Sequence, residues 1–490
     1  MQRYLCFDIG AGSGRALLAG FDGNSLAVSE FSRFSSSAVR TSRGVYWDVL
    51  SIVENIKRTL IEAKTQGHEI HSIGIDCFGV DFGLIAKSGE LLGNPLCDMD
   101  PRTAGILEST GDLWNAADLY KQTGAQIYEM TTLFQLAALK RQGSEALEIA
   151  AKFLMMPDVL NYMLTGETHA EYTVSSTSNL LKLGLLDWNT ELIERFGLNR
   201  KMFLDPVLPG KVKNRLSGMI RDELGIDGVD VVTVAGHDTA SAVAALPDTG
   251  GDSIFISSGT WSIVGAVTDK PIIDMRFAGI LSNEGCHDGK NRLIKNLLGM
   301  KFLQELKSVW AREGRDLSYA LMDEAMEHAK PFTSLIDPEN MAYFSGTNMP
   351  QLMIDYCVRT AQPVPESVGE FVRAANESLA LSYRESIEQI ELASGRKFKS
   401  IYILGGGVQN RHLCQMTADA TRKPVYAWYK ESAAFGNALI QACAAGNLRS
   451  KEMATCAAAS HKSTEFVPDK PGIWDDQYDR FLKLKKKWSS

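Results

Sequence analysis

The feature that most constrains the fold is a strand–turn–strand plan that occurs twice in the 490-residue chain. Residues 3–23 hold two apolar runs joined by the turn GAGSG, and residues 253–267, SIFISSGTWSIVGAV, repeat the plan around a turn of small residues. A strand that enters a glycine-containing turn and then a helix also occurs twice, at 231–245 and 401–420. We therefore predict a duplicated mixed α/β unit, with one copy in each of two domains.

The order of elements supports this division. Three apolar segments within residues 3–35 predict antiparallel strands, 47–67 shows helical spacing with Gly67 as its stop, and 70–79 predicts a buried strand. Residues 105–225 are mostly helical by periodicity and resemble an insertion. The turn-rich segment ALPDTGGDS, 245–253, predicts the boundary, so we expect domains at 1–247 and 248–490. A chain this long exceeds one ordinary core.

Composition excludes several classes of function. No apolar run approaches the roughly 20 residues that span a bilayer, so we expect no membrane insertion. The formal charge of -8 disfavours nucleic acid as a partner. The eight cysteines form no C-x-x-C pair, which favours free thiols in a reducing cytoplasm, and no zinc motif is present. We expect a cytoplasmic protein, in which the basic run LKLKKKW is the solvated face of a last helix.

The segment FDIGAGSGR, residues 7–15, predicts a phosphate site. Gly10, Gly12 and Gly14 allow backbone amides to approach an anion closely, and Asp8 would face the same anion. A carboxylate beside phosphates requires a cation, for which Mg²⁺ is the usual choice. An ordinary hairpin turn is the alternative. A dinucleotide site is disfavoured because the spacing is G-x-G-x-G without a following helix.

Two later segments are candidates for the remainder of a nucleotide site. The turn SSGT, 257–260, occupies the place of the glycine-rich turn in the second copy. The segment GGGVQN, 405–410, separates a strand from a helix expected to begin near Asn410. A flat ligand could lie against these glycines, with Gln409 and Asn410 reading its edge. The alternative is a tight turn, which requires one glycine with positive φ but not obviously three.

The segment GHDTASA, 236–242, places Asp238 at the carboxyl end of a strand. In an open α/β sheet this is where ligands bind, and a second carboxylate there suits a general base that takes a proton from a substrate hydroxyl. Asp238 could instead cap the following helix, as could Thr239. P-loop, protein-kinase and serine-hydrolase motifs are all lacking from the sequence.

Taken in order, these segments resemble the FGGY carbohydrate kinases. The resemblance extends from residue 5 to about 446 and rests on an ordered set of motifs: FDIGAGSGR, IGIDCFGVDF, DPRT, MMPDVLNYMLTG, GHDTASAV, ISSGTWSIVG, LSNEG, NLLGM and LGGGVQN. It implies two ribonuclease-H-like domains of the actin, hexokinase and Hsp70 type around a central cleft. It also implies ATP and Mg²⁺, with L-rhamnulose phosphorylated on its C1 hydroxyl.

The resemblance implies residue roles as well. Asp238 corresponds to the catalytic base and Asp8 to the metal ligand. The implied ATP contacts are Ala11, Gly12, Ser13, Gly14, Arg15, Thr260, Gln304 and Gly406. The implied sugar contacts are Gly79, His237, Asp238, Thr239 and Asn296.

Departures from the family pattern fall on the sugar side. Met99 replaces a cation, Phe78 replaces a tryptophan, and Thr131 replaces an asparagine. L-Fuculose, a pentulose or another hexulose therefore remains an alternative acceptor. Two rival hypotheses are a sugar or nucleotide sensor without turnover and an Hsp70-like ATPase. We expect a monomer or a homodimer.

Overall fold

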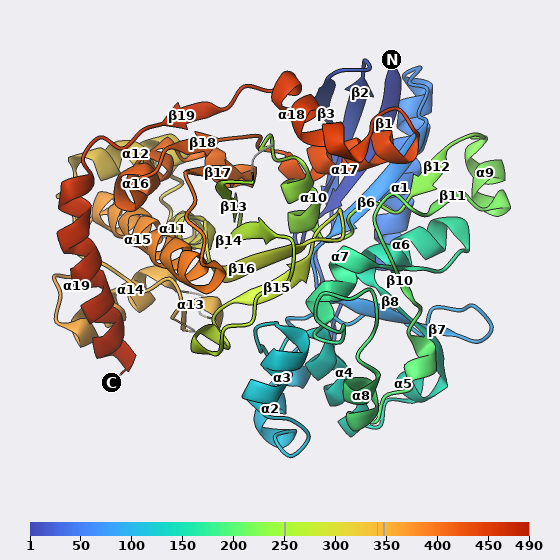
Figure 1. The fold of residues 1–490 in the computed structure, drawn as a ribbon, viewed down its shortest axis with the longest axis horizontal. Coiled ribbons are helices and arrows are strands. Elements are labelled where there is room, and N and C mark those ends of the chain that lie inside the picture. Colours follow the sequence, from blue (N-terminus) through green and yellow to red (C-terminus); the bar gives the residue numbers. More distant parts are fainter. Residues whose placement is uncertain (249–250, 341, 346–347, 490) are drawn as a thin grey trace. The chain divides into compact units, whose positions relative to one another are not determined.

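The computed structural model describes residues 1–248, 251–340, 342–345 and 348–489. The chain packs into two compact units: unit 1 comprises 1–249, 267–293 and 432–461, and unit 2 comprises 250–266, 294–431 and 462–490. Figure 1 labels their elements. The segment 245–253 includes residues 249 and 250, which lie outside the described residues. None of the described helices combines the length and apolar character needed to cross a membrane.

Unit 1 is built on a six-stranded sheet of order β11-β12-β6-β1-β2-β3. β1 pairs antiparallel with β2, which pairs antiparallel with β3, whereas β6 runs parallel to both β1 and β12. The predicted antiparallel start is confirmed. The strands are β1 (Gln2–Ile9), β2 (Ser13–Phe21), β3 (Leu26–Ser35), β6 (Ser72–Cys77), β11 (Lys213–Arg215) and β12 (Asp230–Val232).

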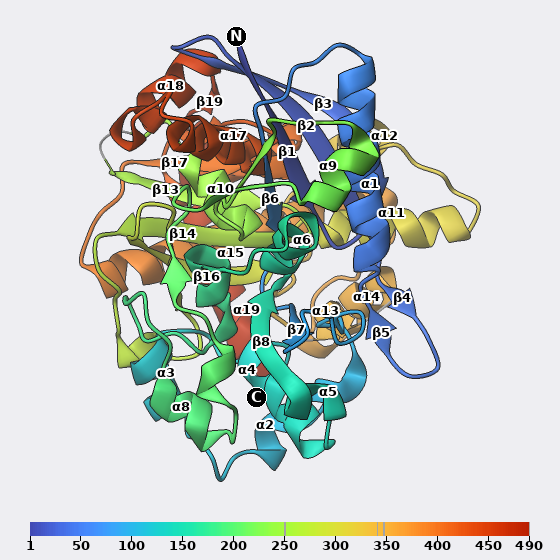
Figure 2. The same cartoon turned by 90° about the vertical axis from the view of Figure 1, so that its right-hand side faces the viewer.

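Successive side chains of β1 point to opposite faces of the sheet, and different helices cover each face. Leu5, Phe7 and Ile9 pack in one apolar cluster with residues of α1 (Val49–Thr65) and α6 (Met156–Thr165). On the opposite face lie α10 (Asp238–Ala244) and α17 (Ser432–Ala444), which contact β6 and each other. Figure 2 shows α1 and α17 on opposite sides of β1 and β2. Asp8 therefore points toward the α17 face.

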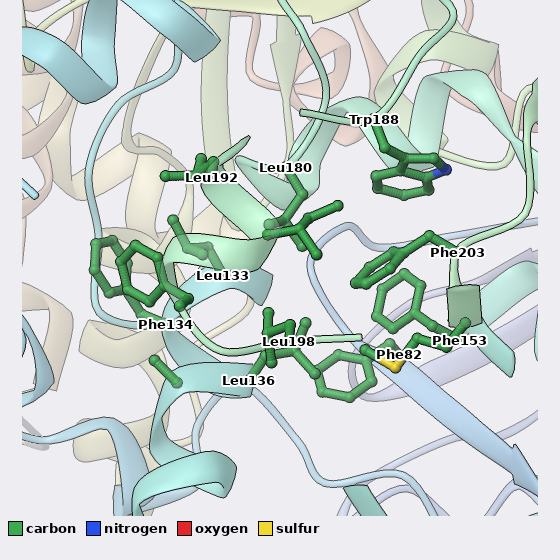
Figure 3. Close-up of a cluster of buried hydrophobic side chains, with 14 of the residues drawn as sticks. Phe82, Leu133, Phe134, Leu136, Phe153, Leu180, Trp188, Leu192, Leu198 and Phe203 are labelled. Atoms are coloured by element: carbon green, nitrogen blue, oxygen red, sulfur yellow. The ribbon is translucent and has the colours of Figure 1, made fainter. Parts of the chain in front are cut away.

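The predicted helical insertion carries its own apolar core (Figure 3). Its helices include α3 (Ala116–Thr123), α4 (Thr132–Arg141) and α8 (Thr190–Arg195), whose apolar side chains belong to this cluster. Trp188 is fully buried in it, with its ring centroid 6.0 Å from that of Phe153 and 5.0 Å from that of Phe203. The sequence did not predict β8 (Ala150–Met155), which pairs antiparallel with β7 (Phe82–Ala86) outside the main sheet. Buried apolar residues at 153–156 satisfy a strand as well as a helix, so periodicity could not separate the two.

Unit 2 contains the second hairpin. β13 (Ser253–Ser258) pairs antiparallel with β14 (Trp261–Thr268) and parallel with β17 (Ser400–Leu404), as the repeated plan predicts. β18 (Val425–Ala427) and β19 (Thr464–Phe466) continue this sheet beyond β17. The long helix α15 (Val368–Ser394) begins at a capping box and packs on α12 (Tyr319–His328) and α16 (Arg411–Thr421).

The basic run near the C-terminus is not entirely solvated. It belongs to α19 (Pro471–Ser489), which packs within unit 2 against α14 (Met349–Thr360), α15 and α16. Lys485 Nζ lies 2.6 Å from Glu385 and 2.9 Å from Glu339. Burial lowers the pKa of Lys485, but the charges of Glu339, Asp337 and Glu385 outweigh it and raise the pKa overall. This part of the run is therefore an internal ion-pair cluster.

Candidate active site

The ends of three parallel strands of unit 1 bring three aspartates together. Asp8 and Asp76 are register partners on β1 and β6, and an isolated bridge joins Cys77 to His237, directly before Asp238. Ligands of open α/β sheets bind at this edge. Burial, followed by the charge of Asp8 and a smaller contribution from Asp238, raises the pKa of Asp76 well above its ordinary value. The three carboxylates thus lie within electrostatic range of one another.

Asp8 and Arg15 form an ion pair across the first hairpin. Asp8 is buried, whereas a quarter of the Arg15 side chain is exposed. In the turn between them, Ala11 and Gly12 are exposed and their N–H groups make no hydrogen bond to another described residue. Gly14 has a packing reason, because a Cβ there would overlap the ring of Phe34. The turn therefore presents two open amides beside a guanidinium, a combination suited to an anion.

Asp76 was not singled out by the sequence. It is fully buried, and its Oδ2 accepts a 2.6 Å hydrogen bond from Asn437 Nδ2 of α17. Its Oδ1 has no hydrogen-bond partner among the described residues, which is costly for a buried carboxyl oxygen. Two adjacent carboxylates, one with an orphaned oxygen, are the hard oxygen donors that Mg²⁺ prefers. The residues present therefore fit the metal that the sequence predicts.

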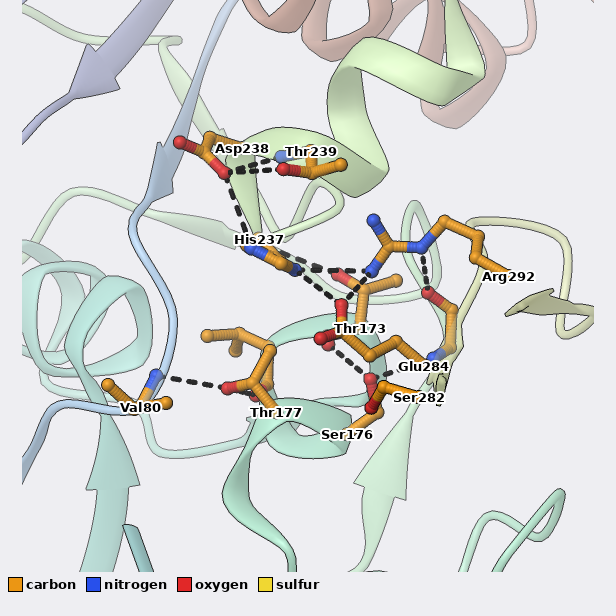
Figure 4. A network of polar contacts seen from close by, with 12 residues as sticks. Val80, Thr173, Ser176, Thr177, His237, Asp238, Thr239, Ser282, Glu284 and Arg292 are labelled. Atoms are coloured by element: carbon orange, nitrogen blue, oxygen red, sulfur yellow. Dashed lines mark hydrogen bonds and ion pairs between the residues drawn. The ribbon is translucent and has the colours of Figure 1, made fainter. Parts of the chain in front are cut away.

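Asp238 is the first residue of α10, and His237 occupies the N-cap position. No side-chain cap bond forms there, so Asp238 does not serve as the N-cap residue. Its Oδ1 accepts hydrogen bonds from the N–H and Oγ1 of Thr239, at 2.5 and 3.2 Å. The side chain is 41% exposed, and among the described residues Oδ2 forms no hydrogen bond or ion pair. Figure 4 shows that oxygen pointing away from His237 and Thr239. One carboxylate oxygen is fixed and the other is accessible.

One short helical segment is hydrogen-bonded to two turns that carry predicted sugar contacts, the turn at Gly79 and the turn at His237. Thr173 Oγ1 accepts from the N–H of His237 at 3.3 Å, and Thr177 Oγ1 accepts from the N–H of Val80 at 3.0 Å. These threonines are four residues apart, across α7 (Tyr172–Ser175) and the 3-10 turn that follows it, so they share one face. Glu171 Oε2 accepts from Gly236 N at 2.9 Å and fixes the same turn.

The turn at 78–81 is strained. Val80 has φ of 64°, a region that β-branched residues rarely adopt. Its carbonyl accepts a 2.6 Å hydrogen bond from Thr132 Oγ1, which helps to hold it there. Strained backbone of this kind concentrates at ligand sites. The adjacent Gly79, the predicted sugar contact, is partly exposed.

The three departures from the family pattern occupy different environments. Phe78 stacks on Trp47 with ring centroids 4.3 Å apart, and Trp47 Nε1 donates to Asp81 Oδ2 at 2.5 Å. Met99 is 60% exposed, whereas Thr131 is buried and donates to the carbonyl of Tyr128. Of the three residues that differ from the family pattern, Phe78 is therefore the one that lies in the strained turn.

In unit 2 the second turn is tied to α11 (Lys301–Arg312). Thr260 Oγ1 donates to Gln304 Oε1 at 3.3 Å, and both residues are exposed. Gly299 N and Met300 N donate to the carbonyls of Thr260 and Gly259. The two ATP contacts predicted here thus lie together.

Gly405 and Gly407 lie against Ser258 of the same turn region. Gly405 has φ of 77°, and a Cβ on Gly407 would overlap Ser258 Oγ. Gly406 is exposed and has no positive φ, and a Cβ placed on it would meet no atom within 4 Å. Asn410 Oδ1 caps α16 by accepting from Leu413 N, and its Nδ2 donates to Asn376, so both ends of its side chain have a structural role.

Asn296, a predicted sugar contact in unit 2, is half-buried on β16 (Asn291–Leu298). Unit 1 contains a small polar pocket that the other predicted sugar contacts do not line. Its wall includes Glu284 of β15 (Ser282–Gly285). The residues around it are Thr123, Tyr172, Ser176, Asn179, Leu181, Lys182, Leu183, Gly184, Asn283, Gly285 and Asn291.

Some signals for the missed residues were present in the sequence. Asp76 is a carboxylate inside an apolar strand, a pattern that points to a partner or ligand. Glu284 lies in the LSNEG motif, but nothing in its surroundings along the chain indicates what it contacts. Thr173 and Thr177 carry no distinguishing local pattern.

Comparison with known proteins identifies the family. The N-terminal domain of the FGGY family of carbohydrate kinases matches residues 3–245, and its C-terminal domain matches residues 254–445. A curated rhamnulokinase of Bacteroides thetaiotaomicron is 36% identical over 482 residues, covering 98% of this chain and 99% of that protein. A rhamnulokinase of Enterococcus faecalis is 33% identical over 488 residues, covering 98% of each.

Solved structures show the same fold. A ligand-bound xylulose kinase from Lactobacillus acidophilus aligns with a TM-score of 0.82 at 16% identity, covering 100% of this chain and 99% of its own. A gluconate kinase from the same organism aligns with a TM-score of 0.81, also at 16% identity, covering 99% and 98%. The prediction of an α/β fold with two sheet-containing domains is confirmed. The chain belongs to the FGGY family of carbohydrate kinases.

Proposed function

We propose that this carbohydrate kinase transfers the γ-phosphoryl group of ATP to the C1 hydroxyl of L-rhamnulose. The substrate proposal is supported by curated relatives named rhamnulokinase at 33–36% identity over most of the chain. The catalytic proposal rests on one observation: Asp238 has one oxygen fixed by Thr239 and the other accessible.

In this proposal Asp238 Oδ2 accepts the proton of the C1 hydroxyl as the sugar oxygen bonds to the γ-phosphorus and the bond to ADP breaks. The two hydrogen bonds from Thr239 hold the carboxylate in one orientation, which is the requirement for a positioned base. His237, Thr239, Gly79 and Asn296 would orient the ketose. Phosphoryl transfer depends mainly on such positioning and on neutralised charge.

On the nucleotide side, the open amides of Ala11 and Gly12, the adjacent Ser13 and Gly14, and Arg15 would hold phosphate oxygens. Thr260, Gln304 and Gly406 would contact the rest of ATP. Asp8, with Asp76 beside it, would hold Mg²⁺, which when bound neutralises phosphate charge. We assign the sugar and base to the domain at 1–247 and these later ATP contacts to the domain at 248–490. We place the enzyme in the cytoplasm, as a monomer or homodimer.

A panel of ketoses tests this proposal. The protein is supplied with ATP and Mg²⁺ and with L-rhamnulose, L-fuculose, L-ribulose or D-xylulose, and ADP release is followed. Phosphorus and carbon NMR then locate the phosphate on each product. The highest kcat/KM should belong to L-rhamnulose, with phosphate on C1. A higher value for another ketose would contradict the substrate, and ADP release with no sugar requirement would contradict the acceptor class.

A further inference from the structure

Two buried, oppositely charged residues stand behind His237 on the side away from Asp238. Arg292 is fully buried, and its Nη2 lies 2.9 Å from Glu284 Oε2 and 3.1 Å from His237 Nδ1. Glu284 Oε2 also lies 3.2 Å from the same Nδ1. Arg292 Nε donates to the carbonyl of Gly285, which fixes the guanidinium plane. Figure 4 shows these groups in sequence behind Asp238.

The chemistry of arginine restricts where the imidazole proton sits. A guanidinium only donates and does not lose its proton in proteins. A hydrogen bond from Arg292 Nη2 to Nδ1 therefore requires Nδ1 to be the acceptor. A neutral His237 then carries its proton on Nε2, which faces Asp238 Oδ1 at 3.4 Å.

The other two protonation forms of His237 either also place a proton on Nε2 or bring two acceptor atoms face to face. A doubly protonated imidazolium also has a proton on Nε2, with Glu284 balancing the charge at Nδ1. A neutral ring protonated on Nδ1 would instead turn the Nε2 lone pair toward the Asp238 oxygen, and two acceptors would repel. The geometry behind the ring supports this position of the proton, because Arg292 Nη2 carries two protons and can donate one to Glu284 Oε2 and the other to His237 Nδ1.

We propose that Glu284 and Arg292 form a positioning pair that keeps a proton on His237 Nε2, facing Asp238 Oδ1. With Thr239 donating to the same oxygen, Oδ1 is saturated and Oδ2 is left as the one site for the proton of the acceptor hydroxyl. The role of the pair rests on the proposed function of Asp238. The protonation state of His237 does not, so the two can fail separately.

The direct test is nitrogen NMR of the protein labelled with ¹⁵N-histidine, recorded without ligands. His237→Gln identifies the signals of that ring among the eight histidines. The parent should show the Nε2–H form when the ring is neutral. Arg292→Lys, which retains a donor, should show the same form. Arg292→Met leaves Glu284 as the sole partner of Nδ1 and should convert the ring to the Nδ1–H form.

A parent ring in the Nδ1–H form would overturn the proposal, and so would an unchanged tautomer in Arg292→Met. The parent spectrum decides the tautomer even if the methionine variant does not fold, and Arg292→Lys supplies a milder change.

Kinetics test the positioning role. For Arg292→Met, kcat should fall about 10- to 100-fold, by analogy with the loss seen when a partner that orients a metal-ligating side chain is removed. Arg292→Lys should recover most of this loss, and KM for ATP should not move in either variant. An altered tautomer with parent-like kcat would refute the positioning role. If no ketose is phosphorylated by the parent protein, the proposed function fails while the spectra still decide the tautomer.

Discussion

The three consecutive glycines at 405–407 have different surroundings. Gly405 adopts a positive φ, and Gly407 leaves room for Ser258, so backbone and packing account for two of them. Gly406 is exposed and a Cβ there would meet no described atom within 4 Å, so neither backbone nor packing requires a glycine at this position. A tight turn therefore explains Gly405, whereas the role of Gly406 as an ATP contact stays a prediction.

Gly406→Val tests this assignment. Because a Cβ meets no atom within 4 Å and the φ is not positive, the variant should fold with parent-like stability. KM for ATP should rise about tenfold or more, which corresponds to losing roughly 1.4 kcal/mol of nucleotide binding. KM for the ketose serves as the internal control and should stay constant. An unchanged KM for ATP would remove Gly406 from the nucleotide site.

Glu171 couples the sugar-side turn to pH. Its carboxyl is fully buried, and burial raises its pKa from 4.5 to about 7 even though Thr173, Val174 and Gly236 donate to it. Between these values the folded protein keeps a proton that the unfolded chain has lost. The free energy of unfolding should therefore fall as pH rises through this window, by up to roughly 3 kcal/mol from this group.

Denaturant unfolding of the parent and of Glu171→Gln at several pH values between 4.5 and 7 measures this effect. The glutamine variant cannot titrate, so its stability should depend less steeply on pH in this window. Equal slopes in the two proteins would show that Glu171 keeps its ordinary pKa.

At the scale of elements, the site depends on two helices that cross at close range. Gly436 of α17 packs on α10 so closely that a Cβ would overlap the carbonyl oxygen of Ser241. From the same helix, Asn437 reaches Asp76, and Gln441 Oε1 accepts from Ser72 of β6. α17 thus positions both α10, which begins at Asp238, and the buried carboxylate of β6.

Gly436→Ala should destabilise the protein by about 1–3 kcal/mol, the usual cost of overpacking, and should lower kinase activity because α10 must shift. Gly472→Ala in α19 is the matched control. No atom lies within 4 Å of its Cβ position, so it should be neutral or stabilising by up to about 1 kcal/mol. Thermal unfolding and initial rates distinguish the two, and equal stability of both variants would contradict the tight crossing.

The same elements show what local sequence could and could not predict. The hairpins at the start of each copy were predictable because alternation and glycine turns are local signals. The partner of Asp76 was not, since Asn437 lies 361 residues further along the chain. The Glu284–Arg292 pair was missed for a related reason: Arg292 lies 55 residues from its target His237, and no periodicity links such positions. The capping role of Asn410 was not predicted, because capping and ligand binding favour the same kind of side chain.

At the scale of the whole molecule, the candidate residues fall into both compact units. Asp8, Arg15, His237 and Asp238 belong to unit 1, whereas Thr260, Gln304, Gly406 and Asn296 belong to unit 2. The segments 267–293 and 432–461 pack with unit 1 although they follow residue 247 in sequence, and the domain boundary at 247/248 stays a prediction.

ATP turnover in the absence of sugar distinguishes this kinase from a sensor and from an Hsp70-like ATPase. A kinase that excludes water should release ADP slowly without a ketose and rapidly with one. A sensor would release no ADP with or without the ketose. An ATPase of the Hsp70 type would release ADP at the same rate in both conditions. Coupled ADP assays with and without saturating ketose measure the difference.

The proposed mechanism depends above all on Asp238 accepting the proton of the sugar hydroxyl, and Asp238→Asn removes that ability while keeping the shape of the side chain. We expect a folded protein that still binds ATP and ketose by calorimetry, with kcat lowered by about 10²- to 10⁴-fold, the range of general-base catalysis. A purified variant that phosphorylates the ketose at nearly the parent rate would show that another group takes the proton.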